Sequence, residues 1–307
     1  MKLVITGALG HIGSKLIREI PSAIPDVEIV MVDNLLNQRY PSVFNLPKNG
    51  NYKLIQEDIL SADLDQLFDK ADIVIHLAAI TNAEGSFEIR EEVEKVNHIG
   101  TEKVAKACIK AGSAMLYLST TSVYGTHSDT VDEDCPESDL KPQSPYAESK
   151  LQGEYLLQKL GNENKFRFIT CRFGTICGVS PGMRFHTAVN KFCWQAVNGQ
   201  PLTVWRTAMH QKRPYLTLQD AVNAMVFIIK KDLFDQNIYN VLTDNLTVES
   251  IINMIEEQIP DPQIEYVETE IMNQLSYTVL NHKFNDQGFE VIANIRENIH
   301  STLEILN

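Results

Sequence analysis

The stretch Thr6-Gly7-Ala8-Leu9-Gly10-His11-Ile12-Gly13 decides the fold that this sequence predicts. A short apolar run, Leu3–Thr6, precedes it, and an amphipathic segment, His11–Ile20, follows it. Glycines at this spacing permit a tight turn and let backbone N–H groups approach a phosphate closely. The N-terminus of the following helix adds the positive end of a dipole. The stretch therefore predicts a strand, turn and helix that together bind a pyrophosphate.

Two acidic residues follow at the ends of the next predicted strands. Asp33 lies twenty residues after Gly13, the spacing of a carboxylate that binds the ribose diol of an adenosine. Its charge would repel a 2′-phosphate, so NAD is favoured over NADP, although the nearby Arg39 leaves NADP open. Asp58 is placed to accept from an adenine amino group. The alternative is that each carboxylate caps a local turn or helix start.

Apolar and amphipathic segments alternate along the first half of the chain. This alternation predicts a parallel sheet with helices on both faces. The predicted strands are Leu3–Thr6, Glu28–Asp33, Tyr52–Gln56, Ile73–Leu77, Met115–Ser119 and Phe168–Phe173, and the predicted helices are His11–Ile20, Leu64–Lys70, Glu91–Ala111 and Tyr146–Leu160.

The pattern weakens after Gly178, where turns and single aromatic residues become frequent. A helix at Ala221–Ile229 and a strand at Ile238–Leu242 restore it. We therefore expect an α/β fold of two parts. Residues 1–178, with 213–242 returning to them, form a dinucleotide-binding domain. Residues 179–212 and 243–307 form a smaller α/β substrate lobe.

A tyrosine and a lysine stand four residues apart in Tyr146-Ala147-Glu148-Ser149-Lys150. On a helix this spacing places both side chains on one face. A lysine ammonium beside a phenol stabilises the phenolate and lowers the tyrosine pKa, which makes the tyrosine a usable base. The hydroxyl-rich turn Ser119-Thr120-Thr121-Ser122 follows a predicted strand, at the sheet edge where ligands bind. Alternatively, the pair is a solvated helix face and the turn satisfies local backbone groups.

Composition limits the classes of function. The net charge of -13 opposes binding to nucleic acid or to an anionic membrane. The sequence has no apolar run near the ~18 residues that span a bilayer, and its first residues do not resemble a signal peptide. Its five cysteines include no CxxC pair, so we expect no metal site, and their scatter is typical of a reducing compartment. We expect a cytoplasmic protein.

These motifs together resemble the extended short-chain dehydrogenases, the NAD-dependent epimerases and dehydratases of nucleotide sugars. The resemblance covers about the first 180 residues closely and continues more loosely to Arg213 and Asp220. It is carried by TGALGHIG, Asp33, Asp58-Ile59, HLAA at 76–79, VNxxGT at 96–101, STTSVYG at 119–125 and YAESK at 146–150.

The resemblance implies a Rossmann-type fold and a role for each matching residue. The implied catalytic residues are Thr120, Tyr146 and Lys150. The implied cofactor-binding residues are Gly7, Leu9, Gly10, His11, Ile12, Gly13, Asp33, Asn34, Asp58, Ile59, Leu77, Ala78, Ala79, Asn97, Tyr146 and Lys150. The implied substrate-binding residues are Thr81, Thr120, Thr121, Tyr146, Thr175, Arg184 and Arg213, with Arg213 placed to hold a diphosphate. His76 is expected to be a core residue rather than a base.

One departure from the family bears on the reaction. In the 4,6-dehydratases an Asp-Glu pair follows the catalytic threonine, whereas this chain has Thr121 and Ser122. The sequence therefore favours an epimerase that oxidises a nucleotide sugar to a transient keto-sugar with bound NAD. A keto-sugar reductase, a dehydratase and a non-catalytic NAD-binding protein are the alternatives. The resemblance also implies a homodimer, formed through a four-helix bundle by Glu91–Ala111 and Tyr146–Leu160.

Overall fold

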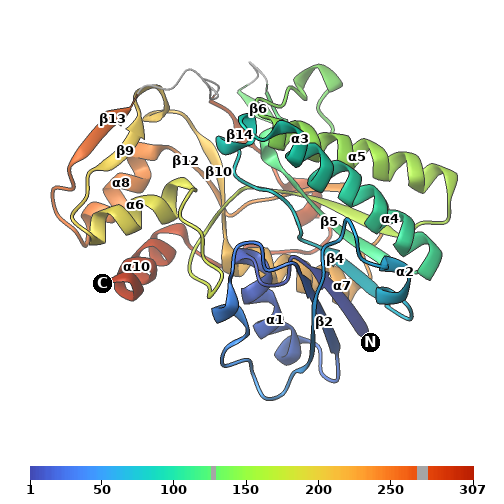
Figure 1. Cartoon of the computed structure of the whole chain (residues 1–307). Helices are drawn as coiled ribbons and strands as arrows, with labels where there is room; N and C mark the ends of the chain where they lie inside the picture. The colour runs from blue at the N-terminus through green and yellow to red at the C-terminus, as the bar shows by residue number, and fades with distance from the viewer. Residues whose placement is uncertain (126–128, 268–275) are drawn as a thin grey trace.

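A seven-stranded parallel sheet forms the centre of the molecule (Figure 1). The computed structural model describes residues 1–125, 129–267 and 276–307. The strands lie in the order β11-β7-β5-β4-β1-β2-β3, with bounds β1 (Lys2–Thr6), β2 (Glu28–Asp33), β3 (Asn51–Gln56), β4 (Ile73–His76), β5 (Ala114–Thr120), β7 (Phe168–Phe173) and β11 (Ile238–Val241). The predicted Rossmann-type sheet is confirmed. Its order reverses between β1 and β4, where such sheets bind ligands beyond the carboxyl ends of the strands.

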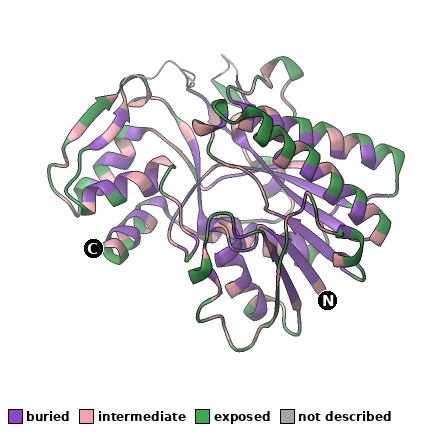
Figure 2. Ribbon diagram, viewed as in Figure 1, coloured by how far each residue is buried: buried purple, intermediate pink, exposed green. Residues whose placement is uncertain are grey.

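Helices cover both faces of this sheet, as Figure 1 shows. Two helices, α1 (His11–Ala23) and α7 (Leu218–Lys231), share one apolar core with the strands. The opposite face carries α2 (Leu64–Leu67), α4 (Gly100–Ala111) and α5 (Pro145–Glu163). Figure 2 shows most of these strands buried between the layers, whereas the edge strand β3 is largely exposed. Burial on both faces explains why β1, β2 and β4 are nearly continuous apolar runs.

Two predicted helices differ in the structure. The helix predicted from residue 64 to 70 ends at Leu67, and Lys70 adopts a positive φ of 56°, which a helix cannot contain. The helix predicted from residue 91 to 111 is divided into α3 (Arg90–Val93), a π-helical turn η3 (Glu94–Ile99) and α4. A π turn adds a residue within an otherwise continuous helix, so the apolar periodicity alone does not reveal it.

The later part of the chain builds a second group of small sheets and helices. The small sheets pair β12 (Asp244–Leu246), β10 (Arg213–Thr217) and β8 (Thr175–Cys177), then β13 (Ile264–Val267) with β9 (Leu202–Trp205), and β14 (Thr278–Val279) with β6 (Thr130–Val131). The helices are α6 (Ala188–Val197), α8 (Val248–Glu256), α9 (His282–Asn285) and α10 (Ile295–Leu306). Three of them, α6, α8 and α10, share an apolar core separate from those of the main sheet.

The two parts are interleaved more closely than the predicted boundaries suggest. Within the returning segment, α7 and β11 join the main sheet's core, but β10 pairs with the small sheet. Conversely, Phe284 and Phe289 pack in the main core beside Phe227 of α7. The division into two lobes at those residue numbers stays a prediction. Across the described ranges, no helix combines the length and apolar character needed to cross a membrane.

Candidate active site

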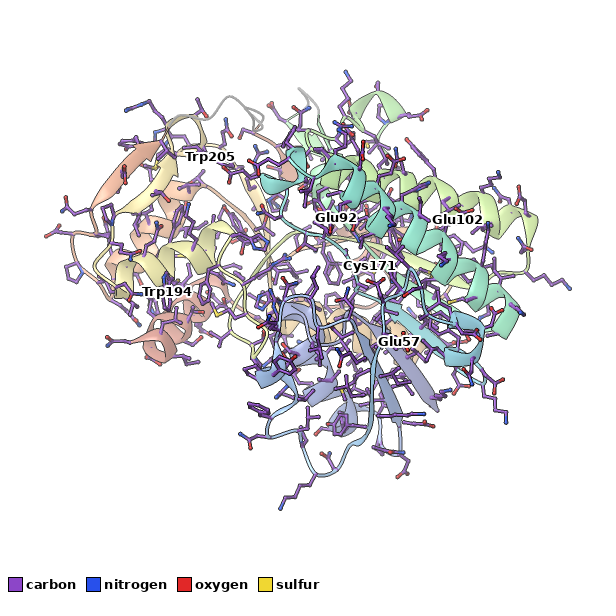
Figure 3. All side chains as sticks on the ribbon, viewed as in Figure 1. Glu57, Glu92, Glu102, Cys171, Trp194 and Trp205 are labelled. Atoms are coloured by element: carbon purple, nitrogen blue, oxygen red, sulfur yellow. The ribbon has the colours of Figure 1, made fainter. Side chains whose placement is uncertain are left out.

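A cavity of about 790 Å³ opens at the carboxyl ends of the central strands. Its walls come from both parts of the chain, and Figure 3 labels three of its residues, Glu57, Glu92 and Trp205. With one exception, every residue that the sequence predicts for the site lines this cavity: Gly7, Leu9, Gly10, His11, Ile12, Gly13, Asp33, Asn34, Asp58, Ile59, Leu77, Ala78, Ala79, Thr81, Thr120, Thr121, Tyr146, Lys150, Thr175, Arg184 and Arg213. The exception is Asn97.

The glycine turn is shaped for a group that approaches the backbone closely. Gly7 has a φ of +66°, and a Cβ there would lie 2.6 Å from the backbone nitrogen of Ala78. A Cβ at Gly13 would lie 2.5 Å from the carbonyl oxygen of Ala8. Gly10 is the N-cap of α1, so the helix begins at the cavity wall without a capping side chain. This cradle fits a pyrophosphate, as the sequence predicts.

Asp33 and Asp58 lie at the same end of the cavity and also make local hydrogen bonds. Asp33 accepts from the backbone N–H of Leu9 at 3.0 Å, which ties β2 to the glycine turn. Asp58 accepts from the backbone N–H of Leu60 at 2.8 Å and from the side chain of Asn34 at 2.9 Å. Both residues therefore hold local backbone in place and present carboxylates to the cavity, so the two interpretations of the sequence are compatible.

Tyr146, Thr120 and Lys150 come together on one wall of the cavity. Burial raises the pKa of Tyr146, and the charge of Arg184 and a hydrogen bond with the Thr120 side chain act in the opposite direction. The sequence predicts Lys150 as the charge that lowers this pKa. In the structure the Lys150 ammonium donates instead to the carbonyl of Leu118 at 2.8 Å.

Lys150 is also buried, and its pKa departs from the ordinary value of a lysine. Burial lowers its pKa to about 7, and the carboxylate of Glu154 acts against this shift. The ammonium also lies 4.9 Å from the ring centre of Tyr117. A lysine with such a pKa changes protonation state within the physiological range, which is common at catalytic sites.

His76 lies next to this group and behaves as the predicted core residue. Its Nε2 is 3.1 Å from the hydroxyl of Thr101, which itself donates to the carbonyl of Asn97 at 2.6 Å. Nε2 must therefore carry the proton, and Nδ1 accepts from the Thr6 hydroxyl at 2.8 Å. Burial lowers the His76 pKa to about 3, so the ring is neutral.

Asn97 supports the cavity wall instead of facing it. Its side chain accepts from the N–H of Ile80 at 2.8 Å, donates to the carbonyl of Ile80 at 2.9 Å, and donates to Ser149 at 3.0 Å. Asn97 is not among the residues that line the cavity, and its direct contact with the cofactor stays a prediction. The π-helical turn η3 instead lets Asn97 fix the loop after β4 to the helix that carries Tyr146.

The substrate end of the cavity carries two arginines. Arg184 donates to the Thr81 hydroxyl and lies near Tyr146, and its buried Nε has no hydrogen-bond partner among the described residues. Arg213 contacts the Tyr277 ring at 5.2 Å and donates to Gln211 at 3.2 Å. Thr175 lies on β8 beside them, and the hydroxyl of Thr121 donates to the carbonyl of Phe173 at 3.3 Å.

Several cavity residues were not predicted from the sequence. Some, such as Glu57 and Glu92, come from the first part of the chain, and others come from the second part, among them His186, Lys191, Trp205, Gln211 and Tyr277. No strand-end or glycine motif marks the positions in the second part, so the sequence carries no local signal for them.

A dinucleotide cradle beside a Thr-Tyr-Lys group defines a class, the nucleotide-cofactor enzymes built on a doubly wound sheet. A profile of the NAD dependent epimerase/dehydratase family matches residues 3–241, and the chain belongs to this family, within the extended short-chain dehydrogenases. NAD is the cofactor of the family.

Curated relatives include enzymes of more than one activity. The trifunctional UDP-glucose 4,6-dehydratase/UDP-4-keto-6-deoxy-D-glucose 3,5-epimerase/UDP-4-keto-L-rhamnose-reductase RHM3 of Arabidopsis thaliana is 29% identical over 313 residues, 98% of this chain and 46% of the plant protein. The dTDP-D-glucose 4,6-dehydratase of Bos taurus is 28% identical over 318 residues, 99% of this chain and 88% of that protein. The chain thus spans about half the length of the plant relative.

Solved structures share the fold over the whole chain. UDP-glucuronic acid 4-epimerase from Bacillus cereus, in complex with UDP-glucuronic acid and NAD, superposes with a TM-score of 0.89 at 23% identity, covering 100% of this chain and 99% of that chain. MoeE5 in complex with UDP-glucose and NAD superposes with a TM-score of 0.85 at 24% identity, covering 99% of this chain and 98% of that chain. At this identity the likeness establishes the fold alone.

Proposed function

We propose that this protein is an NAD-dependent nucleotide-sugar epimerase that inverts one ring carbon through a transient keto-sugar. The observation that carries the proposal is that Thr120, Tyr146 and Lys150 line the same cavity as the glycine cradle. The curated relatives whose names specify UDP- and dTDP-sugars support the substrate class.

The chain's residues supply the proton transfer. Tyr146, as the phenolate, removes the proton of a sugar hydroxyl, and the Thr120 side chain binds the same oxygen. The Arg184 guanidinium stabilises the negative charge on the phenolate. The Lys150 ammonium, held by the Leu118 carbonyl, adds its positive charge from one helical turn away. NAD held by the glycine cradle and Asp33 would supply the hydride acceptor for that carbon and the hydride donor for its other face. Because the net redox change would be zero, the cofactor would not need to leave between turnovers.

The cations of the second part hold the nucleotide. Arg213 and Arg184 offer guanidinium groups suited to a diphosphate, and Thr81 and Thr175 offer hydroxyls to the sugar. These assignments follow from their place on the cavity wall.

The residues after Thr120 argue against dehydration, although several relatives are dehydratases. Elimination of water requires an acid and a base close to the keto-sugar. Here the two positions are hydroxyl residues, and the Thr121 side chain is bound to the carbonyl of Phe173. Neither hydroxyl replaces a carboxyl group as a proton donor at neutral pH.

A keto-sugar reductase is the second candidate, because the names of the plant relatives include this activity. A reductase would use the same tyrosine to donate a proton, but it would consume one reduced cofactor per turnover. Cofactor stoichiometry therefore separates the two candidates.

The proposal is tested by incubating the protein with a panel of UDP-, GDP-, CDP- and dTDP-sugars and resolving the products by chromatography. We expect one member of the panel to yield its epimer without added cofactor, and denatured protein to release NAD. A panel without any epimer, together with consumption of NADH by a keto-sugar, would support the reductase.

We also propose a homodimer formed by η3, α4 and α5. These segments lie side by side on one outer face of the molecule (Figure 1), where Ile99 is 45% exposed and Tyr155 47% exposed. Sedimentation equilibrium should give twice the chain mass, and Ile99→Lys should lower it. A monomer at all concentrations would reject this part of the proposal.

A further inference from the structure

Four consecutive residues at the end of β5 hold the helix that carries the proposed catalytic pair. The Tyr117 hydroxyl donates to the backbone carbonyl of Lys150 at 3.3 Å, and the carbonyl of Leu118 accepts from the Lys150 ammonium. The Ser119 hydroxyl donates to the carboxylate of Glu154, and Thr120 bonds to Tyr146. Three successive turns of α5 are thus fixed to the strand in one register.

Glu154 extends the catalytic face of α5 by one more turn. It lies four residues after Lys150, as Lys150 lies four after Tyr146, so all three share a face. Its carboxylate is 2% exposed and accepts from Arg172 of β7, from Nη2 at 2.6 Å and from Nε at 3.0 Å. Arg172 in turn donates to the Tyr124 hydroxyl at 2.9 Å. No sequence motif described above includes the pair of Glu154 and Arg172.

The cost of burying two charges makes a purely structural role a poor explanation. A buried ion pair often contributes no more stability than apolar side chains of similar volume. Glu154 and Arg172 are among the most deeply buried charged residues described, and they lie directly beneath the reacting groups. The alternative explanation is that the Glu154 carboxylate, one helical turn after Lys150, acts on the charge of that lysine.

We propose that Glu154 is a positioning residue of the reaction, which fixes α5 on β5 through Ser119 and on β7 through Arg172, and keeps the Lys150 ammonium protonated beside Tyr146. The proposal rests on the proposed function for its catalytic meaning, but the electrostatic claim about Lys150 is independent of it.

The other groups that face Lys150 do not replace Glu154. On its own helix, Tyr146 is a neutral phenol whose pKa is raised by burial. From β5, Tyr117 is also a buried phenol with a raised pKa, and from β4, His76 is neutral. Arg172 of β7 carries a positive charge and pairs with Glu154, so it offers no attraction to the Lys150 ammonium. Among these groups, Glu154 alone attracts the ammonium.

The test is a ¹³C NMR titration of the full-length chain carrying labelled lysine, with the Lys150 signal assigned by its loss in Lys150→Met. In Glu154→Gln, the titration midpoint of Lys150 should fall by about one pH unit or more, because an attraction is lost and Arg172 is left uncompensated. Glu148→Gln removes the same charge from the exposed side of the same helix, where Glu148 pairs with Arg90, and should leave the midpoint unchanged.

A second variant keeps the test decisive if Glu154→Gln is too unstable to titrate. The double variant Glu154→Gln with Arg172→Met removes both members of the ion pair, so neither is left without the other, and its Lys150 midpoint should still lie below that of the wild type. An unchanged midpoint in a folded variant lacking the Glu154 carboxylate would overturn the proposal, since a purely structural role lowers stability without moving the Lys150 titration.

Turnover provides the second readout. If the wild type epimerises a nucleotide sugar, the alkaline limb of its kcat profile should move to lower pH in Glu154→Gln. At a fixed pH on that limb, kcat should fall about tenfold if the limb moves by one pH unit. If the wild type shows no epimerisation, the proposed function fails while the NMR titration still decides the role of Glu154.

Discussion

At the scale of single residues, the site is a group of polar side chains whose properties are set by burial. Tyr146 and Lys150 are both shifted away from their ordinary pKa values by removal from water, and nearby charges act against those shifts. Thr120 connects the phenol to the end of β5. The chemistry we propose therefore depends on the phenol oxygen of Tyr146 in this setting.

Replacing Tyr146 by Phe tests that dependence. Because the substitution removes only the hydroxyl, we expect kcat to fall by about 10²–10⁴-fold while NAD remains bound and the fold is kept. Steady-state kinetics and release of NAD on denaturation provide the measurements. Tyr266→Phe is the matched control, since this exposed tyrosine of β13 lies outside the cavity lining. Equal kcat values in the two variants would exclude Tyr146 as the acid–base group.

The sequence predicts site residues well where a motif fixes them to the end of a strand. Asp33, Thr120 and the glycine turn lie on the cavity because parallel strands end at one edge of the sheet. The contact made by Asn97 could not be predicted, since it depends on a π-helical turn that apolar periodicity does not show. Tyr277 and Trp205 reach the cavity only through the tertiary packing of the second part.

At the scale of elements, the turn between β1 and α1 depends on backbone space as well as conformation. Gly7 and Gly112 both have positive φ, 66° and 71°. A Cβ at Gly7 would meet the backbone of Ala78, whereas a Cβ at Gly112 would meet nothing within 4 Å. Alanine substitutions at the two glycines therefore separate two free-energy costs, that of a positive φ and that of a steric clash with neighbouring backbone.

We expect Gly112→Ala to lower the free energy of unfolding by about 1 kcal/mol, the cost of a left-handed conformation in a residue with a Cβ. Gly7→Ala should cost more, and it should also abolish retention of NAD, because the turn must move away from Ala78. Urea unfolding and the NAD content of the purified variants test both statements. If Gly7→Ala retains NAD at the wild-type level, the cradle is not the binding site for the pyrophosphate.

At the scale of the whole molecule, two buried histidines connect folding to pH. His11 of the glycine turn bonds to Ser180 of the second part at 2.8 Å, and His76 lies within the main sheet. Burial lowers the pKa of each to about 3. In the unfolded chain both return to about 6.5, so between these values the unfolded state binds protons that the folded state does not.

The stability that these histidines contribute should therefore be complete above pH 6.5 and decrease as the pH falls toward 3. Each one adds a slope of up to about 1.4 kcal/mol per pH unit to the free energy of unfolding. Urea unfolding at a series of pH values measures this slope. His76→Gln should reduce it, and His282→Gln, at an exposed position, should not. A wild-type slope near zero between pH 6 and 4 would show that the two histidines do not connect folding to pH.

The parallel sheet and its covering helices could be predicted because most of the strands are distinct apolar runs, whereas the order of the strands comes from the structure. The second part could not be predicted in the same detail. Its strands are short, for example Thr175–Cys177 and Asp244–Leu246, and they pair across long distances in the sequence. Phe284 illustrates the limit, since it lies late in the chain but packs in the first core.

The most direct test of the proposed epimerisation follows the hydrogen of the inverted carbon. A nucleotide sugar accepted by the protein, with deuterium at every ring carbon, is converted in ordinary water and its product is analysed by mass spectrometry. We expect an epimer that retains all of the deuterium, with no net production or use of NADH. A product that has lost water or ring deuterium, or a reaction that consumes NADH in proportion to product, would contradict a transient keto-sugar that forms and collapses on one bound cofactor.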